Sequence, residues 1–350
     1  MLVTHPLPGR TIVVDGRERL YFSGTSYLGM GHSEDFRSLL QEGMNHYGTV
    51  YSSSRASNVQ LAVYEEAEDI LAELTGAPAA LTFSSGYQAG QAATQRLHSK
   101  PNFFYAPGTH PAVWRNAADA VYGDFAAWAD TAVDRVSRTE GEVVIVANSL
   151  DPLFALRHDF SWVARLPDDR VITLLVDDSH GLGITGCNGG GVHATLRSLA
   201  KPNVTVVVVS SLGKAFGVPG GVVLGPADFI DGLRKSPFFT AGSSVPPAYL
   251  YAYPRAQLLY QQARQRLFAN VAYFQRLTNE FSLFRSIEQY PVFYTADNAL
   301  AEAVAPDGVL SSFPYPHPDS APITRVVVSS LHQKEDVDRL AALIKRYITS

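Results

Sequence analysis

Residues 206–221 read VVVVSSLGKAFGVPGG, so a run of four valines passes through two serines to a lysine and a group of glycines. A continuous run of β-branched residues is typical of a strand that is covered on both faces of a mostly parallel sheet. Lys214 follows this run, and a lysine near a buried strand is costly in free energy unless its amine has a partner or a chemical task. We therefore interpret Lys214 as a functional residue, against the alternative of a lysine whose stem lies along the surface.

A second apolar run, Val171–Val176, ends in the polar string DDSHG at residues 177–181. Ligands of open α/β sheets bind at the carboxyl ends of the strands, so we expect Asp177 and Lys214 at one site. A lysine that forms a Schiff base and a carboxylate that keeps a pyridine nitrogen protonated are the pair that a pyridoxal 5'-phosphate (PLP) enzyme requires. His180 could bind the phenolic oxygen of that cofactor, although a strand-end Asp and a lone His also occur in purely structural roles.

Three further segments supply candidate contacts to the same cofactor. The turn SSGY at residues 84–87 follows a predicted strand and opens a predicted helix, whose N-terminal N–H groups and dipole would hold a phosphate. Ser211 could bind the same phosphate, and the imidazole of His110 could stack on the cofactor ring. An ordinary strand-to-helix turn and a loop histidine are the alternatives.

Composition bounds the class of protein. The 350 residues are 46% hydrophobic and 17% charged, which predicts a compact protein, and the net charge of −5 gives no reason to expect nucleic acid or an anionic membrane as a partner. The single cysteine, Cys187, excludes an intrachain disulfide and a cysteine-based zinc cluster. The first ten residues lack the pattern of a signal peptide and no apolar run reaches transmembrane length, so we expect a cytoplasmic protein.

The order of apolar runs predicts an α/β fold with a mostly parallel sheet flanked by helices, followed by a smaller α+β region. We expect an N-terminal segment over residues 1–36, a large cofactor-binding domain over 37–250 and a small C-terminal domain over 251–350. A long helical stretch is predicted from about Pro246 to about Phe284. The predicted strands of the large domain are 79–83, 102–105, 143–147, 171–176, 204–209 and 221–224.

Capping residues and prolines give local predictions. Ser33 is expected to cap a helix that runs to about His46, and Asn58 to cap a second helix that ends at Gly76. The proline-rich segment 312–319 is predicted to be a loop.

Six segments together resemble the α-oxoamine synthases, a family of fold-type I PLP-dependent enzymes of the aminotransferase class. The resemblance spans most of the chain and implies the fold, the cofactor and a homodimer with shared active sites. The matching segments are SGTSYLG (23–29), the span from YG (47–48) to SSR (53–55), FSSGY (83–87), VDDSHG (176–181), SLGKAFG (211–217) and SSVPP (243–247).

The resemblance also implies a role for each candidate residue. Lys214 would carry the Schiff base, and the helpers would contact the ring: Asp177 the pyridine nitrogen, His180 the phenolic oxygen and His110 the ring face. The phosphate would be held by Ser85, Gly86, Tyr87 and Ser211, with Ser244 reaching it from the other subunit. Arg325 resembles the arginine that receives a substrate carboxylate, and Thr25 stands at a position that helps to place the substrate.

The sequence departs from the family pattern mainly at positions that are expected to bind or place the substrate. Thr25 and Gly90 each stand where the family usually has Asn, and ANSLDP at residues 147–152 replaces a longer segment, which leaves Ser149 as the candidate for a cofactor-contacting serine. The chain is also shorter than is usual in the family. The predicted cofactor-binding residues thus resemble the family more closely than the predicted substrate-binding residues do.

Three functions are compatible with these residues. The first is an acyltransferase that condenses an amino acid with an acyl thioester and releases CO2 to give an α-oxoamine. The second, suggested by the altered positions Thr25, Gly90 and Asn148, is transamination or aldol cleavage with the same cofactor. The third is a partner subunit without activity, which the retention of Lys214 and Asp177 argues against.

Overall fold

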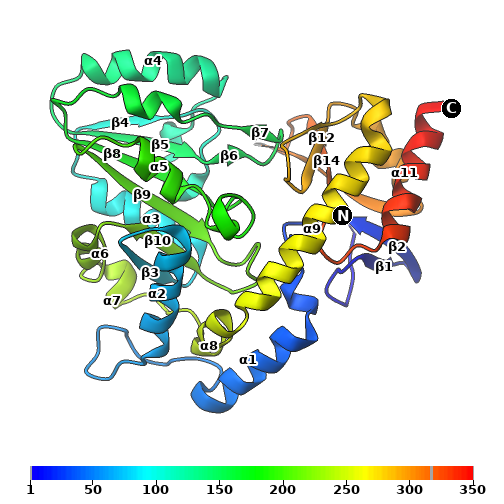
Figure 1. Ribbon diagram of the computed structural model, residues 1–350, viewed down its shortest axis with the longest axis horizontal. Coiled ribbons are helices and arrows are strands. Elements are labelled where there is room, and N and C mark those ends of the chain that lie inside the picture. The colour runs from blue at the N-terminus through cyan, green and yellow to red at the C-terminus, as the bar shows by residue number, and fades with distance from the viewer. Residues whose placement is uncertain (1, 316–317, 350) are drawn as a thin grey trace. The chain divides into compact units, whose positions relative to one another are not determined.

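The computed structural model describes residues 2–315 and 318–349 and divides into two compact units (Figure 1). The large unit consists of Glu34–Leu150 and Arg157–Gln257, and the small unit consists of Met1–Ser33, Asp151–Leu156 and Leu258–Ser350. The N-terminal residues, which the sequence suggested as a region of their own, are therefore part of the unit that contains the C-terminal residues.

A six-stranded sheet forms the centre of the large unit, with strand order β3-β10-β9-β8-β5-β4. The pairs β4–β5, β5–β8 and β8–β9 are parallel, and β10 is antiparallel to both of its neighbours, so the predicted mostly parallel sheet is confirmed. The strands are β3 (Ala79–Phe83), β4 (Asn102–Tyr105), β5 (Val143–Asn148), β8 (Ile172–Asp177), β9 (Val204–Ser211) and β10 (Gly221–Gly225). A separate two-stranded ladder pairs β6 (Leu150–Asp151) with β7 (Leu156–Arg157).

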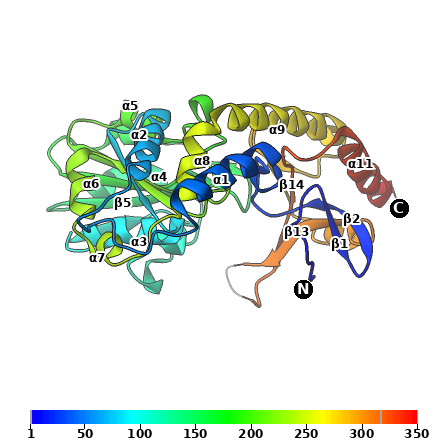
Figure 2. The ribbon, with the colours of Figure 1, turned by 90° about the horizontal axis from the view of Figure 1, so that it is seen from below.

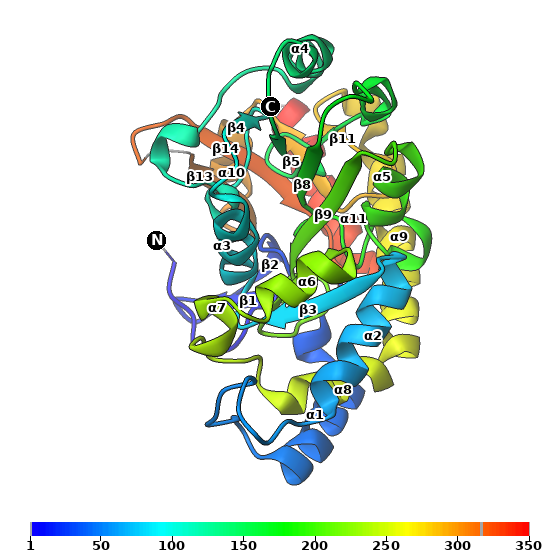
Figure 3. The same cartoon turned by 90° about the vertical axis from the view of Figure 1, so that its left-hand side faces the viewer.

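Helices cover both faces of the large-unit sheet, as Figure 3 shows for α3 (Gly86–Leu97) on one face and α5 (His193–Leu199) on the other. Alanines of α3 and apolar residues of α6 (Ala227–Leu233) pack with Val207, Val209 and Val223 in one buried cluster. Burial on both faces explains why β9 is a continuous valine run. The remaining α-helices of this unit are α1 (Glu34–Tyr47), α2 (Val63–Thr75), α4 (Phe125–Ser137), α7 (Pro237–Thr240) and α8 (Pro247–Arg255).

The start of α2 corrects the sequence prediction, whereas its end confirms it. The helix begins at Val63, after Ala62, and not after Asn58. The segment before it is an irregular loop in which the hydroxyls of Tyr51 and Ser57 both donate to the carbonyl of Val59, so these polar residues serve the loop. Gly76 ends the helix in the left-handed conformation, with φ of 67°.

The small unit holds a second six-stranded sheet, with order β1-β2-β13-β14-β12-β11. The parallel pairing of β2 with β13 brings the N-terminal strands to the C-terminal ones. Figure 2 shows α9 and α11 on the same side of this sheet. The elements are β1 (Thr11–Val14), β2 (Arg17–Phe22), β11 (Arg285–Ser286), β12 (Val292–Thr295), β13 (Gly308–Pro314), β14 (Pro322–Val327), α9 (Gln257–Thr278), α10 (Ala299–Val304) and α11 (Lys334–Thr349).

Two further differences from the sequence predictions lie near prolines. The long helical stretch is divided into α8 and α9 at Ala256, two residues after Pro254, which itself lies inside α8. The segment 312–319 begins as strand, because β13 extends to Pro314, which faces Pro322 at the end of the ladder and loses no central pairing. Residues 316 and 317 of that segment lie outside the described residues. No helix in the described part of the chain is long and apolar enough to cross a membrane.

Candidate active site

Lys214 lies in the loop between β9 and β10, at the carboxyl end of the valine strand, where its side chain is half-buried. Burial lowers the pKa of its amine, and the nearby carboxylate of Asp177 partly opposes this effect. A lowered pKa increases the fraction of neutral amine, which is the form that acts as a nucleophile or a base.

Asp177 is the last residue of β8, and only 7% of its surface is exposed. Its Oδ1 accepts a hydrogen bond of 2.9 Å from the backbone N–H of Ser179, which fixes the carboxylate at the strand end. Its Oδ2 lies 3.9 Å from Nδ1 of His110. The structure thus brings Asp177, His110 and Lys214 together, as the sequence predicted for the edge of a parallel sheet.

The ring of His110 is held in a defined orientation. Its Nδ1 accepts a 3.2 Å hydrogen bond from the backbone N–H of Ala112, so in the neutral ring the proton is carried by Nε2. Burial lowers the pKa of His110; the Asp177 carboxylate raises it, and the Lys214 amine lowers it. The neutral imidazole is therefore favoured near pH 7.

The turn before α3 is built as the sequence predicted. The Oγ of Ser85 caps the helix by accepting a 3.1 Å bond from the N–H of Gln88, and the hydroxyl and N–H of Ser84 both donate to the side chain of Gln88. A Cβ at Gly86 would lie 2.7 Å from the Cβ of Ser211, so the helix start and the end of β9 are in close contact. Backbone N–H groups at the start of a twelve-residue helix, beside a serine hydroxyl, suit a phosphate.

The ends of β8 and β9 are tied to one another by hydroxyl groups. The N–H of Ser211 donates to the Oγ of Ser179 at 2.9 Å, and the hydroxyl of Ser210 donates to the carbonyl of Asp178 at 3.2 Å. His180 follows directly and is half-buried. Ser149, at the end of β5, donates its N–H to the carbonyl of Asp177 at 2.9 Å, so it lies at the same edge of the sheet.

Asp178 is a buried acid that sequence reasoning did not single out. It is 1% exposed, its Oδ2 accepts from the N–H of Val192 at 2.9 Å, and a Cβ at Gly181 or Gly191 would lie about 2 Å from its carboxyl oxygens. The pKa of Asp178 is raised to about 7, mainly by burial and in smaller part by the Asp177 carboxylate, while hydrogen bonds from Ser149 and from the N–H of Val192 partly oppose the rise. Only the three-dimensional packing of the glycines reveals this environment.

Replacing Asp178 by Asn is expected to stabilise the protein relative to wild type as the pH rises. The folded carboxyl has a pKa of about 7, whereas its unfolded value is about 3.9. Between these values the folded state keeps a proton that the unfolded state releases, so wild-type stability falls as the pH rises, by about 4 kcal/mol over the whole interval, and the amide variant does not show this loss. Urea unfolding of both proteins near pH 5 and near pH 8 measures this; a constant difference between them contradicts the raised pKa.

The two predicted substrate residues lie in the small unit. Arg325, on β14, is 7% exposed; its guanidinium donates to the carbonyl of Pro152 at 2.8 Å and to the hydroxyl of Ser311 at 3.0 Å. Its Nε is buried without a hydrogen-bond partner among the described residues. Thr25 is half-buried, between β2 and the short helix Met30–His32. That these two residues act on the substrate stays a prediction.

Ser244 and Tyr87, two candidate phosphate-binding residues, differ in their surroundings. The phenol of Tyr64 donates to the carbonyl of Val245 at 2.9 Å and therefore accepts from the hydroxyl of Ser244 at 2.6 Å. Tyr87, in contrast, is 57% exposed. The hydroxyl of Ser244 is thus already bonded in a single chain.

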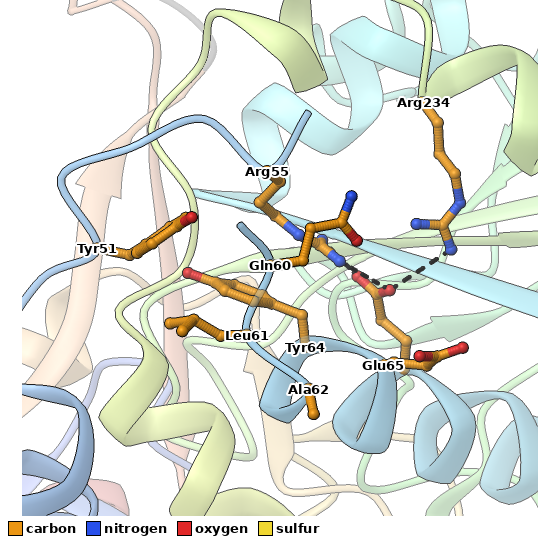
Figure 4. A pocket seen from close by; sticks show the side chains of 9 residues that line it. Tyr51, Arg55, Gln60, Leu61, Ala62, Tyr64, Glu65 and Arg234 are labelled. Carbon is orange, nitrogen blue, oxygen red and sulfur yellow. Dashed lines mark hydrogen bonds and ion pairs between the residues drawn. The ribbon is translucent and has the colours of Figure 1, made fainter. Parts of the chain in front are cut away.

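A pocket of about 510 Å³ lies beside α2 and is lined by Tyr64 and by Arg55, the last residue of the SSR segment (Figure 4). Its centre is an ion pair between Arg55 and Glu68 at 2.6 Å, with Arg234 3.7 Å from the same carboxylate. Glu68 also accepts the N–H and the hydroxyl of Thr82 on β3, each at 2.7 Å. The pair therefore fastens α2 to the strand that leads into the Ser85 turn.

Comparison with known proteins places the chain in a family. Residues 154–344 match the family described as aminotransferase class I and II. The 8-amino-7-oxononanoate synthase of Pseudomonas aeruginosa (strain LESB58) is 27% identical over 350 residues, which cover 95% of this chain and 86% of the relative. The enzyme of that name from Methylococcus capsulatus is 30% identical over 276 residues, which cover 75% of this chain and 70% of the relative.

A solved structure of a lysine-to-alanine variant of serine palmitoyltransferase from S. paucimobilis, with a bound PLP–myriocin aldimine, shares the fold, with a TM-score of 0.83 at 16% identity over 100% of this chain and 93% of that chain. The fold that was expected from the sequence is therefore confirmed. The chain belongs to the aminotransferase class I and II family of PLP-dependent enzymes, and within it to the α-oxoamine synthases.

Proposed function

We propose that this protein is a PLP-dependent acyltransferase that condenses an amino acid with the acyl group of a thioester. The observation that carries the proposal is the juxtaposition of Lys214, Asp177 and His110 at the carboxyl edge of the sheet, with Asp177 and His110 3.9 Å apart. Relatives named 8-amino-7-oxononanoate synthase, which match over most of the chain, favour acyl transfer over the other reactions of this cofactor.

The reaction balances without a further reactant. The Cα–H bond of the amino acid breaks, a carbon–carbon bond forms between Cα and the acyl carbonyl carbon, and the carbon–sulfur bond breaks so that the sulfur leaves with a proton as the thiol. The bond from Cα to the carboxylate breaks to release CO2, and a proton takes its place on Cα. Bound PLP supplies an electron sink for the negative charge that develops at Cα.

The residues of the large unit have distinct tasks in this proposal. Lys214 carries the cofactor and then moves the proton at Cα, for which its lowered pKa is suited. Asp177 holds a proton on the pyridine nitrogen, and the neutral ring of His110 stacks on the cofactor. His180 donates to the phenolic oxygen. The phosphate is held by Ser85, Gly86, Tyr87 and Ser211.

Arg325 is proposed to bind the substrate carboxylate, with Thr25 helping to place the substrate. A guanidinium has five N–H donors, and two of those of Arg325 are used by Pro152 and Ser311. The buried Nε has no hydrogen-bond partner in the described part of the chain, so a carboxylate that reached it would satisfy this donor. A planar fork of donors suits that ligand.

We further propose a homodimer. Val50, Val59 and Tyr87 are among the exposed apolar side chains of the large unit, and a second copy that covered them would remove this surface from water. In that assembly Ser244 would reach the partner's phosphate, which requires its hydroxyl to leave Tyr64. Light scattering is expected to give twice the chain mass of 38.0 kDa.

The proposed reaction is tested by thiol release. The protein is incubated with each of the common amino acids and with acyl-CoA or acyl-carrier thioesters, and free thiol and CO2 are measured together. Equal amounts of the two products, dependent on both substrates, support acyl transfer. A keto acid formed from the amino donor with no thiol released would instead indicate an aminotransferase.

A further inference from the structure

The segment from Gly108 to Trp114, which carries His110, is braced against two separate elements. On one side it packs on α3, and on the other it is bonded to the end of β5. The residues that make these contacts include Gly90 and Asn148, two of the positions at which the chain departs from its family's pattern. The departures therefore converge on one segment that lies beside Asp177.

The brace on the α3 side depends on the absence of a side chain at Gly90. A Cβ at this position would lie 2.5 Å from the carbonyl oxygen of Ala112 and 2.9 Å from its carbonyl carbon, which no side chain tolerates. The next residue, Gln91, uses this proximity, because its amide donates to the carbonyls of Ala112 and Trp114 at 3.0 Å each. The backbone that follows His110 is thereby fixed to the helix.

The brace on the β5 side is the carboxamide of Asn148. Its Nδ2 donates to the carbonyl of Gly108 at 2.7 Å, and its Oδ1 accepts the backbone N–H of His110 at 3.2 Å. The backbone carbonyl of Asn148 is held in turn by Nδ1 of His158 at 2.9 Å. Asn148 also pairs with Asp177 in the register of β5 and β8, so it spans the distance between the carboxylate and the segment.

An asparagine can make these two bonds only because it has both a donor and an acceptor and carries no charge. The charged groups that face His110 are the carboxylate of Asp177 and the amine of Lys214. A carboxylate at position 148 would repel the carbonyl of Gly108 and would add a second negative charge beside the imidazole. The neutral amide thus fixes the histidine without altering the balance between these two charges.

We propose that Asn148 is a positioning residue that holds His110 over the cofactor site, with Gly90 and Gln91 bracing the same segment from α3. The inference rests on the proposed role of His110 in PLP chemistry. It assigns a role to Gly90 and Asn148, two positions at which the sequence departs from the pattern that it otherwise resembles. Asn148 acts through His110 and does not itself touch the reacting atoms.

The test is an NMR titration of the His110 ring in the full-length, PLP-loaded protein labelled with 15N-histidine, in which His110→Gln identifies the resonance. In wild type we expect a neutral ring near pH 7 with its proton on Nε2. In Asn148→Asp we expect the pKa of His110 to rise, because a carboxylate now faces the imidazole. In Asn148→Leu, which has neither bond, we expect a mixture of the two tautomers.

Kinetics provide the second readout. Asn148→Leu is expected to lower kcat about tenfold while the KM for the amino acid changes little, since a misplaced group acts on the transition state. Asn203→Asp and Asn203→Leu are matched controls, because the amide of Asn203 also donates to two backbone carbonyls, of Pro167 and Arg170, but at the start of β9, away from the catalytic edge. These controls should leave the His110 resonance and kcat unchanged.

An unchanged His110 titration and tautomer in folded Asn148→Asp and Asn148→Leu would overturn the proposal, and so would an equal effect of the Asn203 variants. If Asn148→Asp and Asn148→Leu unfold the protein, Asn148→Ser serves as the test variant, because serine is smaller than asparagine and creates no steric overlap. The NMR readout does not depend on thiol release, so a failure of acyl transfer and a failure of this inference are distinguishable.

Discussion

Replacement of Lys214 by alanine is expected to reduce turnover by about 10⁴-fold or more and to remove the absorbance band of the lysine-bound cofactor. The change deletes both the nucleophile that carries the cofactor and the base that moves the proton at Cα, and proton transfer alone contributes about 10²–10⁴-fold. Absorbance spectra and thiol release, measured on the same preparations, check this expectation.

Lys201→Ala is the matched control for this prediction. Lys201 is also partly buried and also lies near a carboxylate, since its Nζ is 3.0 Å from Asp168, but that pair is at the start of β9, away from the catalytic edge. We expect the control to keep the spectrum and the activity of wild type. A Lys214→Ala protein that retained its absorbance band, or an equal loss in both variants, would show that Lys214 does not carry the cofactor.

Asp177→Asn is expected to lower kcat/KM by about 10²–10³-fold, the scale observed when one preorganised electrostatic contact to a transition state is removed. The amide can still accept the N–H of Ser179 through its oxygen, so the end of β8 should remain folded. It cannot hold a proton on the pyridine nitrogen, and the electron sink is weakened as a result. The free energy of unfolding is expected to change far less than the activity.

Two observations separate this prediction from a general loss of structure. Asp168→Asn removes an exposed carboxylate of the Lys201 pair and is expected to leave kcat/KM at its wild-type value. The Asp177→Asn protein should still bind PLP through Lys214, with an altered absorbance spectrum. Wild-type kcat/KM in the folded Asp177→Asn variant would contradict the role that we assign to this carboxylate.

The central strands were predictable from the sequence because the residue types within each strand indicate that it is buried. Runs such as Val204–Val209 are β-branched throughout and apolar except for Thr205, which is the pattern of a strand covered on both faces. Asp177 and Lys214 could be paired for the same reason, since each follows such a run and parallel strands end at one edge. The proximity of Asp177 and Lys214 could therefore be predicted from the expected sheet topology alone, without knowledge of side-chain packing.

Other features depend on contacts between distant segments and leave little trace in local sequence. The N-terminal strands join the C-terminal ones through the pairing of β2 with β13, and no sequence pattern within either strand predicts this pairing. Gly90 and Asn148 stood out only as departures, because their common purpose appears when Ala112 and His110 are placed between them. The raised pKa of Asp178 likewise results from burial that the glycines 181 and 191 permit.

Local signals also misled where a polar residue had more than one possible task. Asn58 has the chemistry of a helix cap, but the loop before α2 is closed by hydrogen bonds to Val59, and the helix begins at Val63. The prolines of the segment 312–319 indicated a loop, yet Pro314 lies at the end of a strand, where no N–H is required of it. In both cases contacts with other parts of the chain, and not the local sequence, determine where the helix or the strand ends.

The most direct measurement is a mass-spectrometric map of the PLP-loaded protein after reduction with borohydride, which converts a Schiff base into a stable secondary amine. We predict a phosphopyridoxyl group on the peptide that contains Lys214 and none on peptides that contain the other lysines. A protein that carried no phosphopyridoxyl group, or carried it on a different lysine, would contradict the account of this site.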